Sequence, residues 1–538
     1  MKPNLLFIMT DQQKATSLDL YNPSGSAAET RALRGLAEEG TVFENASCPY
    51  PLCVPSRISM LTGIYPSASG FVGNGPYIED RYQTVFGAAK QRGYRTMLVG
   101  NDHAYTKAAI GGDPGMHPKF MDTIFDSMYC AMHNTYQPPE IERDLPHVRP
   151  WLNETSVLHR IWGSEVAPWT SRQSISARLC DVAMENLDRW DAEDRAEDTP
   201  FALWLSFPDP HELYQAPADV FESIDPTSIA LPPNWESDIA NRAEYIRFMH
   251  WYFNAGGVPE EEVLKLIRVY LAMCKNVDMQ LERLFAFLRR RGLWENTVVV
   301  YTSDHGDFNG EHQLIQKFNA GYDGCCRVPL IIAQPGASQS RRYAGPVTLT
   351  DIPSTLCDLL GWDRFAADQG CSLAETVMSG APRAVNYTVT ESGLYGESLT
   401  TKDIANFPNH RYDRRPVGRW SYDPPHRFGG KLYAVRSSDY KMIVRQDQKT
   451  ELYDMVADPW ETRNIAEEPG FEQTVRQHYG LLTDHLMRIS QRRPDTRIAS
   501  QDDWYRAGGN KAWEEVVPED DVAHPSRRRG GSQARPSG

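Results

Sequence analysis

The string CVPSRISMLTG, from Cys53 to Gly63, is the stretch whose residue types most clearly suggest chemistry. A cysteine stands close to Arg57, and the run after this arginine predicts a helix that ends at the glycine. A packed structural cysteine is the ordinary interpretation of a single thiol. Such a thiol needs no fixed neighbours of this kind, so the string raises a second interpretation, a cysteine that is chemically modified, and the residues by themselves leave both open.

A reactive cysteine is also the mark of cysteine-dependent phosphatases, which place an arginine six residues after the cysteine. Position 59 is Ser59, and the arginine comes too early, at Arg57. The spacing therefore excludes this class of enzyme.

Dense polar clusters follow four apolar runs elsewhere in the chain. The runs are residues 4–9, 95–99, 201–206 and 297–301, and the clusters are Thr10-Asp11-Gln12-Gln13, Gly100-Asn101-Asp102-His103, Asp209-Pro210-His211-Glu212 and Asp304-His305-Gly306-Asp307. Open α/β sheets bind ligands beyond the carboxyl ends of their strands. The four clusters therefore predict one site assembled from distant parts of the sequence.

Asp11, Gln12, Asp304 and His305 form a ligand set for a hard divalent cation. Oxygen ligands alone favour calcium, whereas one imidazole makes manganese a competitor. Taken singly, each aspartate is equally consistent with the cap of a following helix. Because the segment SDHGD is so compact, metal ligation is the stronger interpretation of the whole set.

The elements that must position these side chains are strands and helices in alternation. Strands are predicted at 4–9, 95–99, 201–206, 297–301 and 328–333, and helices at 30–40, 84–92, 174–190, 260–291 and 352–360. Continuous apolar runs of this length are typical of strands buried on both faces of a parallel sheet. The alternation predicts an α/β fold with a large mixed, mostly parallel sheet sandwiched by helices.

The pattern changes after about residue 380. Shorter strand-like pieces occupy 431–436 and 440–444, and a helix is predicted near 473–490. We therefore expect a catalytic α/β domain over 1–380 and a smaller C-terminal α+β domain with an antiparallel sheet over 381–491. Residues 492–538 are rich in Arg, Pro, Gly, Ser and acids, and they predict a largely disordered tail.

Bulk composition narrows the possible partners. The formal net charge of −15 argues against general nucleic-acid binding, which needs a basic footprint. Nine scattered cysteines do not suggest a disulfide framework. The first apolar run is too short for a signal peptide, and the sequence has no run of about 18 apolar residues. No membrane partner is expected, and the cytoplasm is the expected compartment.

The string at Cys53 resembles the signature of the type I, formylglycine-dependent sulfatases of the alkaline phosphatase superfamily. The resemblance continues in order along most of the chain, through PNLLFIMTDQ, GYRTMLVG, SFPDPHE, SDHGDFNGEH, Lys317, VPLII, TLTDIPSTLCDLLG and ELYDMVADPWETRNIA. The first string and SDHGD are the specific signals, whereas ELYD mostly supports the fold. The chain resembles the region of the superfamily where sulfatases and phosphonate monoester hydrolases branch.

The resemblance implies that a formylglycine-generating maturation enzyme oxidises Cys53. The hydrated aldehyde then offers a geminal diol, one oxygen of which attacks a sulfate monoester, and the covalent sulfate intermediate collapses by elimination. The resemblance also implies that Asp11, Gln12, Asp304 and His305 hold one divalent cation, Ca²⁺ or alternatively Mn²⁺, together with an oxygen of modified Cys53.

The same resemblance assigns roles to four other residues. Arg57 offsets negative charge near the nucleophile with a fixed donor fork that lysine lacks. His211 stabilises or protonates the leaving oxygen, and Lys317 contacts the transferring group. His103 removes the second diol proton and so triggers elimination. For His211, a plain loop histidine is the alternative interpretation.

One departure from the family pattern bears on the substrate. Many relatives have Gly-Lys-x-His where this chain has Gly100, Asn101, Asp102 and His103. One fewer cation favours monoanionic esters over dianionic phosphate monoesters. Phosphonate monoester and phosphodiester hydrolases resemble sulfatases and also lack this lysine, so they stay an alternative function. Asn74 and Asn101 are the predicted substrate-binding amides.

Two irregular segments, 105–163 and 395–430, carry aromatic residues and arginines that suit a pocket for a sugar, aryl or anionic leaving group. Packing of loops against the core is an equally good interpretation of any one of these residues. We expect a small anionic ester as substrate, and a homo-oligomer is possible because the family often forms one. A non-catalytic protein on the same fold is the remaining alternative.

Overall fold

The computed structural model describes residues 2–23, 25–74, 78, 82–105, 120–125, 164–193, 195, 198–253, 258–336, 340–393 and 429–491. These residues all lie within one compact unit, Met1–Thr496. The predicted disordered tail, 492–538, lies outside the described residues, as do most of the two segments expected to shape the substrate pocket.

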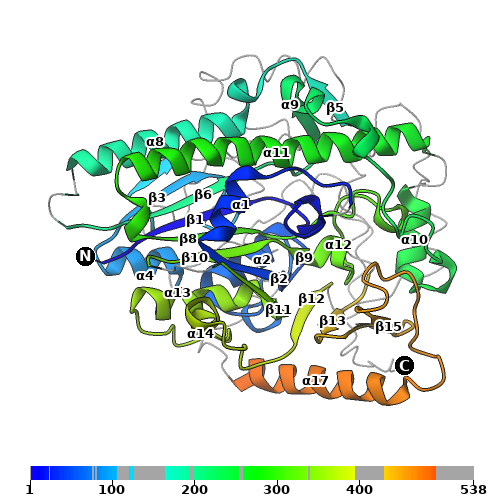
Figure 1. The fold of residues 1–538 in the computed structure, drawn as a ribbon. Coiled ribbons are helices and arrows are strands. Elements are labelled where there is room, and N and C mark those ends of the chain that lie inside the picture. Colours follow the sequence, from blue (N-terminus) through cyan, green and yellow to red (C-terminus); the bar gives the residue numbers. More distant parts are fainter. Residues whose placement is uncertain are drawn as a thin grey trace, which may run out of the picture. The chain divides into compact units, whose positions relative to one another are not determined.

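A nine-stranded mixed sheet forms the centre of this unit (Figure 1). Its order is β11-β2-β10-β8-β1-β6-β3-β4, and β9 pairs with β2. The strands are β1 (Asn4–Thr10), β2 (Gly40–Ser47), β3 (Arg95–Gly100), β4 (Thr123–Phe125), β6 (Phe201–Phe207), β8 (Thr297–Ser303), β9 (Arg327–Val328), β10 (Leu330–Ala333) and β11 (Arg341–Thr348). The pairs from β8 through β1, β6 and β3 to β4 are all parallel. The predicted fold class is therefore confirmed.

The run 328–333 differs from its prediction. It forms two short strands, β9 and β10, which are interrupted at Pro329. Proline has no backbone N–H to give to a ladder, so it ends the first strand. β10 runs antiparallel to both β8 and β2, whereas the apolar run alone suggested another parallel strand.

Helices cover both faces of the sheet, so the central strands are buried on both faces. Every residue of β1, β6 and β8 is buried, as the continuous apolar runs predict. Along one face lie α1 (Arg31–Glu38), α8 (Ile175–Glu193) and the long α11 (Glu260–Arg290) (Figure 1). Along the other lie α2 (Cys53–Thr62), α4 (Val85–Gln91), α13 (Ile352–Leu360) and α14 (Ala374–Ser379) (Figure 1).

Helix α2 confirms the helix predicted from the Cys53 string. All ten of its residues are buried, and Cys53 is its first residue. The helix ends at Gly63, which adopts a left-handed conformation with φ of 74°. Only glycine takes this conformation without strain. The string therefore places the thiol at the N-terminal end of an entirely buried helix.

A separate antiparallel sheet follows in the C-terminal part of the chain. Its order is β12 (Thr388–Ser392), β13 (Leu432–Arg436), β14 (Tyr440–Arg445) and β15 (Glu451–Asp454). The predicted terminal helix is α17 (Glu472–Gln491). The small antiparallel sheet is thus confirmed, while the domain boundary near residue 380 stays a prediction. Among the described residues, the other α-helices and strands are α3 (Pro66–Ser69), β5 (Ser164–Ala167), β7 (Tyr214–Pro217), α9 (Ala218–Glu222), α10 (Glu244–Phe253) and α12 (Asp323–Cys326).

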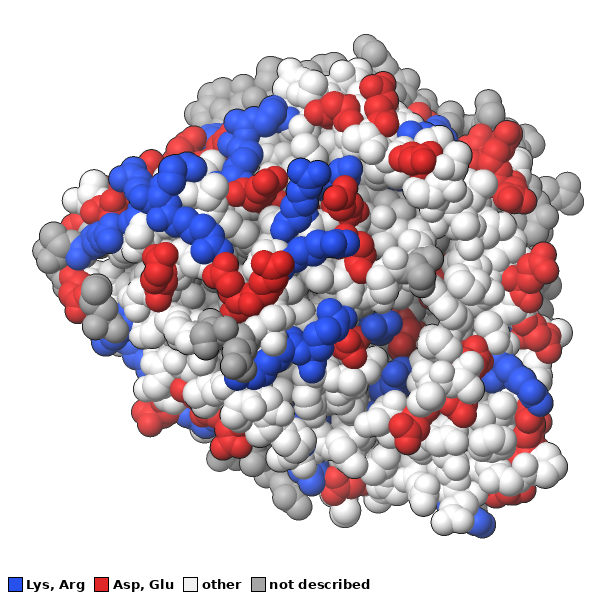
Figure 2. Space-filling view, viewed as in Figure 1, with Lys and Arg blue, Asp and Glu red and all other residues white. Residues whose placement is uncertain are grey.

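Surface charges alternate in sign on the face drawn in Figure 2, where basic and acidic side chains lie beside one another. Between α8 and α11, Arg283 pairs with Asp181. Just beyond the end of α11, Arg291 pairs with Asp188 and Asp191 of α8. Exposed pairs of this kind contribute little stability individually.

Among the described helices, none is both long enough and apolar enough to span a bilayer. The eight described cysteines are free thiols.

The surroundings of Gly100 show how closely neighbouring strands pack next to the polar clusters. Its φ is 110°, and a Cβ there would lie 1.8 Å from the Ser206 carbonyl oxygen of the neighbouring strand. Gly93 has a φ of 82° but open space around it. Gly93→Ala should cost roughly 1–2 kcal/mol through backbone strain alone. Gly100→Ala should cost more than about 3 kcal/mol, because the new Cβ would also collide with the Ser206 carbonyl. Both costs are measured as the decrease in the free energy of unfolding in urea. Equal decreases in the two variants would contradict the close packing at Gly100.

Candidate active site

The four predicted polar clusters meet at one edge of the central sheet. They follow β8, β1, β6 and β3, which are consecutive neighbours. Main-chain hydrogen bonds tie the clusters together: Asp304 N donates to Thr10 O at 3.3 Å, Asp11 N to Asp209 O at 3.4 Å, and Asn101 N to Ser206 O at 3.1 Å. The four clusters, which are distant in sequence, are therefore brought together by the fold.

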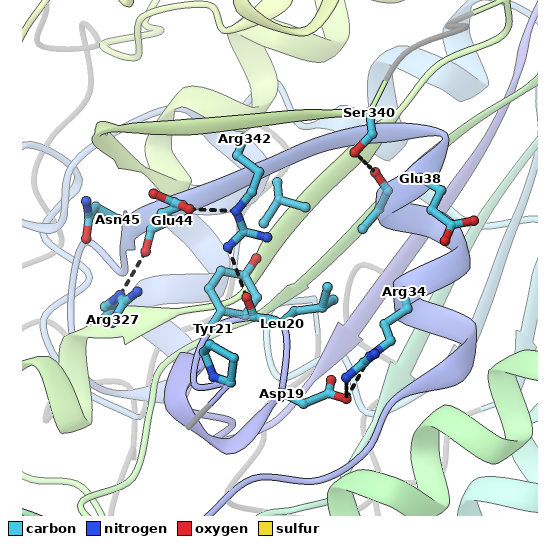
Figure 3. Close-up of a pocket in the computed structure, with 13 residues that line it drawn as sticks. Asp19, Leu20, Tyr21, Arg34, Glu38, Glu44, Asn45, Arg327, Ser340 and Arg342 are labelled. Atoms are coloured by element: carbon cyan, nitrogen blue, oxygen red, sulfur yellow. Dashed lines mark hydrogen bonds and ion pairs between the residues drawn. The ribbon is translucent and has the colours of Figure 1, made fainter. Parts of the chain in front are cut away.

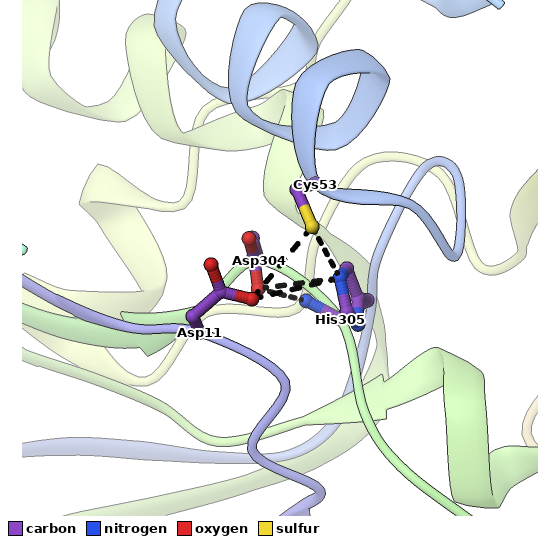
Figure 4. Close-up of side chains that lie close together, drawn as sticks. All are labelled: Asp11, Cys53, Asp304 and His305. Carbon is purple, nitrogen blue, oxygen red and sulfur yellow. Dashed lines mark hydrogen bonds and ion pairs between the residues drawn. The ribbon is translucent and has the colours of Figure 1, made fainter. Parts of the chain in front are cut away.

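Asp11, Cys53, Asp304 and His305 bring one potential ligand atom each within 4.8 Å of all the others, and all four residues are buried (Figure 4). Cys53 Sγ lies 3.2 Å from His305 Nε2 and 3.7 Å from Asp11 Oδ1. His305 Nδ1 lies 3.0 Å from the Gly306 carbonyl. A carbonyl only accepts, so Nδ1 carries the proton and the Nε2 lone pair faces the cluster.

Arg57 lies beneath this cluster and has no exposed surface. Its Nε donates to Asp304 Oδ2 at 2.7 Å and its Nη2 to Asp11 Oδ2 at 2.6 Å. Nη1 donates to the Asn101 carbonyl at 2.7 Å. Burial disfavours the charge, but Asp304 and Asp11 together hold the pKa of Arg57 above its ordinary value. Arg57 is therefore an internal counter-ion and not the surface ion pair that its residue type alone would allow.

The two aspartates have opposite pKa shifts. Burial raises the pKa of Asp304, but His305 and Arg57 outweigh burial and hold it below its usual range. The pKa of Asp11 is raised to about 6 by burial and by the neighbouring charge of Asp304. One guanidinium therefore does not fully neutralise two buried carboxylates. A cation is the complement that this electrostatic environment calls for.

Gln12 supports the same conclusion from a different atom. Its backbone N donates to Asp304 Oδ1 at 3.0 Å, and its side-chain Nε2 donates to Asp307 Oδ2 at 2.5 Å. Its Oε1 is buried and has no hydrogen-bond partner among the described residues. A buried acceptor without a donor is costly. Oxygens of Asp11, Gln12 and Asp304 with one imidazole nitrogen fit a divalent cation.

His211, Glu212 and Lys317 form a second group of contacts. Lys317 Nζ lies 2.5 Å from His211 Nε2 and 3.1 Å from Glu212 Oε1. Glu212 is buried, and despite this its pKa is lowered to about 2 by His211 and Lys317. The sequence predicted His211 and Lys317 as site residues but assigned no role to Glu212. The only signal for it was its place in the cluster Asp209-Pro210-His211-Glu212.

His103 reaches the cluster from the end of β3. Its Nδ1 lies 3.8 Å from Asp11 Oδ2, and its Nε2 is buried without a partner among the described residues. Burial and Arg57 lower the pKa of His103 to about 3, so its ring is neutral near pH 7. Asp102 Oδ1 accepts hydrogen bonds from the backbone N of Ala104 and of Tyr105, at 2.6 and 2.9 Å. Asp102 thereby turns the chain at His103.

The two predicted substrate-binding amides lie near the cluster in different ways. Asn74 is exposed, and its Oδ1 accepts a hydrogen bond from Val54 N at 3.2 Å, at the start of α2. Asn101 is buried and contacts Arg57 through its backbone carbonyl. Their roles toward substrate stay predictions, as do the catalytic roles of Arg57, His103, His211 and Lys317.

A surface pocket of about 710 Å³ lies elsewhere, between the loop around Asp19, α1, β2 and β11 (Figure 3). Its charged side chains bond within the pocket: Arg34 to Asp19, Arg342 to Glu44, and Arg327 to the Glu44 carbonyl. It contains none of the predicted site residues. This hollow is therefore a different place from the buried cluster at Cys53.

The sulfatase family model matches residues 3–362. The chain is 27% identical over 489 residues to the uncharacterized sulfatase YidJ of Escherichia coli strain K12, and the aligned region covers 91% of this chain and 88% of that relative. It is also 27% identical over 480 residues to the choline-sulfatase of Rhizobium meliloti strain 1021, and this alignment covers 87% of this chain and 83% of that relative.

The fold is also similar to a solved structure, the phosphonate monoester hydrolase of Agrobacterium radiobacter. The TM-score is 0.70 at 21% sequence identity, with 91% of this chain and 96% of that chain covered. The family match spans most of the chain and includes Cys53 with its three buried neighbours. The chain therefore belongs to the sulfatase family.

Proposed function

We propose that this protein hydrolyses a sulfate monoester and that residue 53, after oxidation to formylglycine, supplies the nucleophilic oxygen. The observation that carries the proposal is the position of Cys53. It is the first residue of a buried helix, and its Sγ lies 3.2 Å from His305 and 3.7 Å from Asp11. A side chain in this place faces the residues that fit a divalent cation.

The acidity of Cys53 argues against an unmodified thiol as the nucleophile. Burial, and after it the charge of Asp11, raise the pKa of Cys53 well above its ordinary value. The thiolate is the reactive form, so the thiol is nearly inert at neutral pH. A hydrated aldehyde supplies oxygens instead, which suits transfer of a sulfuryl group by way of a covalent ester on residue 53.

Asp11, Gln12, Asp304 and His305 are the residues that would hold the cation, Ca²⁺ or else Mn²⁺. When bound, such a cation polarises the oxygens of the ester and favours ionisation of the nucleophile. Arg57 holds both aspartates in place from below. His103, near Asp11 and without a partner on Nε2 among the described residues, lies where the residue that the family resemblance makes the proton acceptor would be needed.

The charge of the site favours a monoanionic substrate. Asp11, Asp304, Asp307 and Glu212 are buried acids of the site, and Arg57 and Lys317 are its buried arginine and lysine. A divalent cation would offset this excess of acids. Because Asn101 stands where many relatives have a lysine, the site has few positive charges that its own carboxylates do not already engage, which suits a sulfate monoester better than a dianionic phosphate monoester.

A phosphonate monoester or phosphodiester hydrolase is the second candidate function, because those substrates are monoanions too. Asn101 stands where many relatives have the lysine of the motif Gly-Lys-x-His. The hydrolases of this second class lack the same lysine. A non-catalytic role is less well supported, because the buried ligands and the Lys317 contacts are all present.

Peptide mass spectrometry tests the modification. The chain produced together with a formylglycine-generating enzyme should yield a residue-53 peptide that has lost one sulfur and two hydrogens and gained one oxygen. The Cys53→Ala variant, made in the same way, should keep the calculated mass of its sequence and have no sulfate-ester activity. Recovery of only the unmodified thiol from the wild type would contradict the proposed mechanism.

Calorimetric titration of the chelator-treated protein with Ca²⁺ and Mn²⁺ tests the cation site. Asp307 can only accept, so it fixes Nε2 of Gln12 toward itself and leaves Oε1 for a cation. Asp307→Asn removes this constraint and should weaken cation binding about 10- to 100-fold. Tyr214→Phe is the matched control, because it removes the other donor to Asp307 Oδ2, at 2.7 Å, but spares the Gln12 contact. Equal affinities in Asp307→Asn and the wild type would rule out this orientation of Gln12.

A comparison of two esters on one enzyme preparation separates the two hydrolase functions. We expect a higher kcat/KM for 4-nitrophenyl sulfate than for 4-nitrophenyl phenylphosphonate, because the family assignment outweighs a likeness of fold. A phosphonate preference of several orders of magnitude would reassign the protein to the second function. Dianionic 4-nitrophenyl phosphate should be a poor substrate in either case, because Asn101 stands where many relatives have a lysine that would offset the second negative charge.

A further inference from the structure

Glu212 is a buried acid next to the reacting centre, and none of the family roles described above uses it. It is 6% exposed and follows His211 directly. Its Oε1 accepts a hydrogen bond from Lys317 Nζ at 3.1 Å, and its Oε2 lies 3.5 Å from His211 Nδ1. The question is whether this carboxylate only stabilises the fold or whether it controls the two residues beside it.

The hydrogen bonds of His211 fix its proton. Nδ1 lies 2.5 Å from the carbonyl oxygen of Glu212, and Nε2 lies 2.5 Å from Lys317 Nζ. A carbonyl only accepts and an ammonium only donates. Nδ1 therefore carries the hydrogen and Nε2 accepts from Lys317. In this arrangement the imidazole is neutral and has no proton on the nitrogen that faces Lys317.

The positive charge of this group therefore resides on Lys317. Burial disfavours its ammonium, but the charge of Glu212 holds the pKa of Lys317 above its ordinary value. The pKa of His211 is lowered, first by burial and further by Lys317, although Glu212 opposes the shift. The two shifts agree with the hydrogen-bond geometry, in which the ammonium donates and the imidazole accepts.

The donors of Lys317 can be counted. An ammonium has three N–H groups, of which Glu212 Oε1 and His211 Nε2 each accept one. One N–H is left once both contacts are made. Lys317 is 9% exposed, and its charge also acts on Cys53. The remaining donor thus belongs to a nearly buried cation whose charge reaches Cys53.

We propose that Glu212 is a positioning residue that keeps Lys317 charged and, together with His211, directs its third N–H toward the leaving oxygen of the substrate. The inference rests on the proposed function. It makes the Lys317 ammonium, held by a neutral His211, the group that stabilises the charge that develops as the bond between sulfur and the leaving oxygen breaks.

Leaving-group dependence distinguishes this role from a structural one. Aryl sulfates with a weakly acidic phenol place more charge on the leaving oxygen in the transition state than those with an acidic phenol. In Glu212→Gln, kcat/KM should fall about 100-fold for 4-methylphenyl sulfate but less than about tenfold for 4-nitrophenyl sulfate. If the wild type prefers phosphonates, the same comparison applies to the corresponding aryl phenylphosphonates.

A pH profile gives a second readout. Without the carboxylate, burial lowers the pKa of Lys317, so the alkaline limb of kcat/KM should move to lower pH in Glu212→Gln. Glu212→Asp keeps the charge and should recover part of the wild-type profile. Glu212→Gln should also cause little additional loss in a Lys317→Ala background, because the cation that it positions is already absent.

Asp278→Asn is the matched control. Asp278 is a buried acid of α11 that accepts hydrogen bonds from Leu33 N and Ala32 N of α1, outside the polar clusters of the site. It should alter stability without changing the leaving-group dependence. Uniform losses across the aryl series in Glu212→Gln, with an unmoved alkaline limb, would overturn the inference and leave the proposed function intact. A wild type that hydrolyses neither ester would overturn the proposed function, and this inference with it.

Discussion

The paired contact of Arg57 with Asp11 and Asp304 is the interaction on which the site depends. All three side chains are buried, and the guanidinium reaches both carboxylates and the Asn101 carbonyl at once. A buried carboxylate without a partner either takes up a proton or destabilises the fold. Lysine could neutralise one of these acids but could not form the same planar fork. Arg57 therefore connects α2 to the ends of three strands.

Strained backbone at two positions is consistent with this tight assembly. Gln12 and His103, which are not glycines, have left-handed φ angles of 65° and 48°. Such residues cost about 1–3 kcal/mol each and persist where surrounding contacts determine the conformation. Here the contacts are specific. Gln12 N donates to Asp304, and Asp102 holds the turn that follows His103. The backbone is thus bent where the Gln12 side chain reaches Asp307 and where His103 reaches Asp11.

The sequence predicted which polar clusters come together better than it predicted the whole sheet. Parallel strands place their carboxyl ends together, so four clusters after four apolar runs were enough to bring Asp11 and Asp304 close in space. The edge strand β11 was not predicted, because its sequence RRYAGPVT mixes exposed charges with a proline and a glycine. A short apolar run such as β10 also carries no information about strand direction, which is set by its neighbours.

The supporting residues could not be found from sequence for a related reason. Glu212 and Asp307 lie inside recognised clusters, but an acid in a loop is far more often solvated or a cap than a partner of a catalytic cation. Glu212 and Lys317 are separated by 105 positions, and Tyr214 and Asp307 by 93. The roles of these residues exist only in contacts across the fold, which local patterns do not encode.

These contacts explain why a thiolate is disfavoured at Cys53. A thiolate at Cys53 would add a negative charge beside Asp11 and Asp304, which is why burial and these acids raise the pKa of the thiol. Arg57 is already engaged by the two aspartates and Lys317 by Glu212, so neither is free to compensate that charge fully. A cation held by the same two aspartates would offset these charges and favour ionisation of a nucleophile at residue 53. The carboxylates that suppress the thiolate in the absence of a cation are therefore those that would hold the cation, and the proposed chemistry at residue 53 depends on that ion.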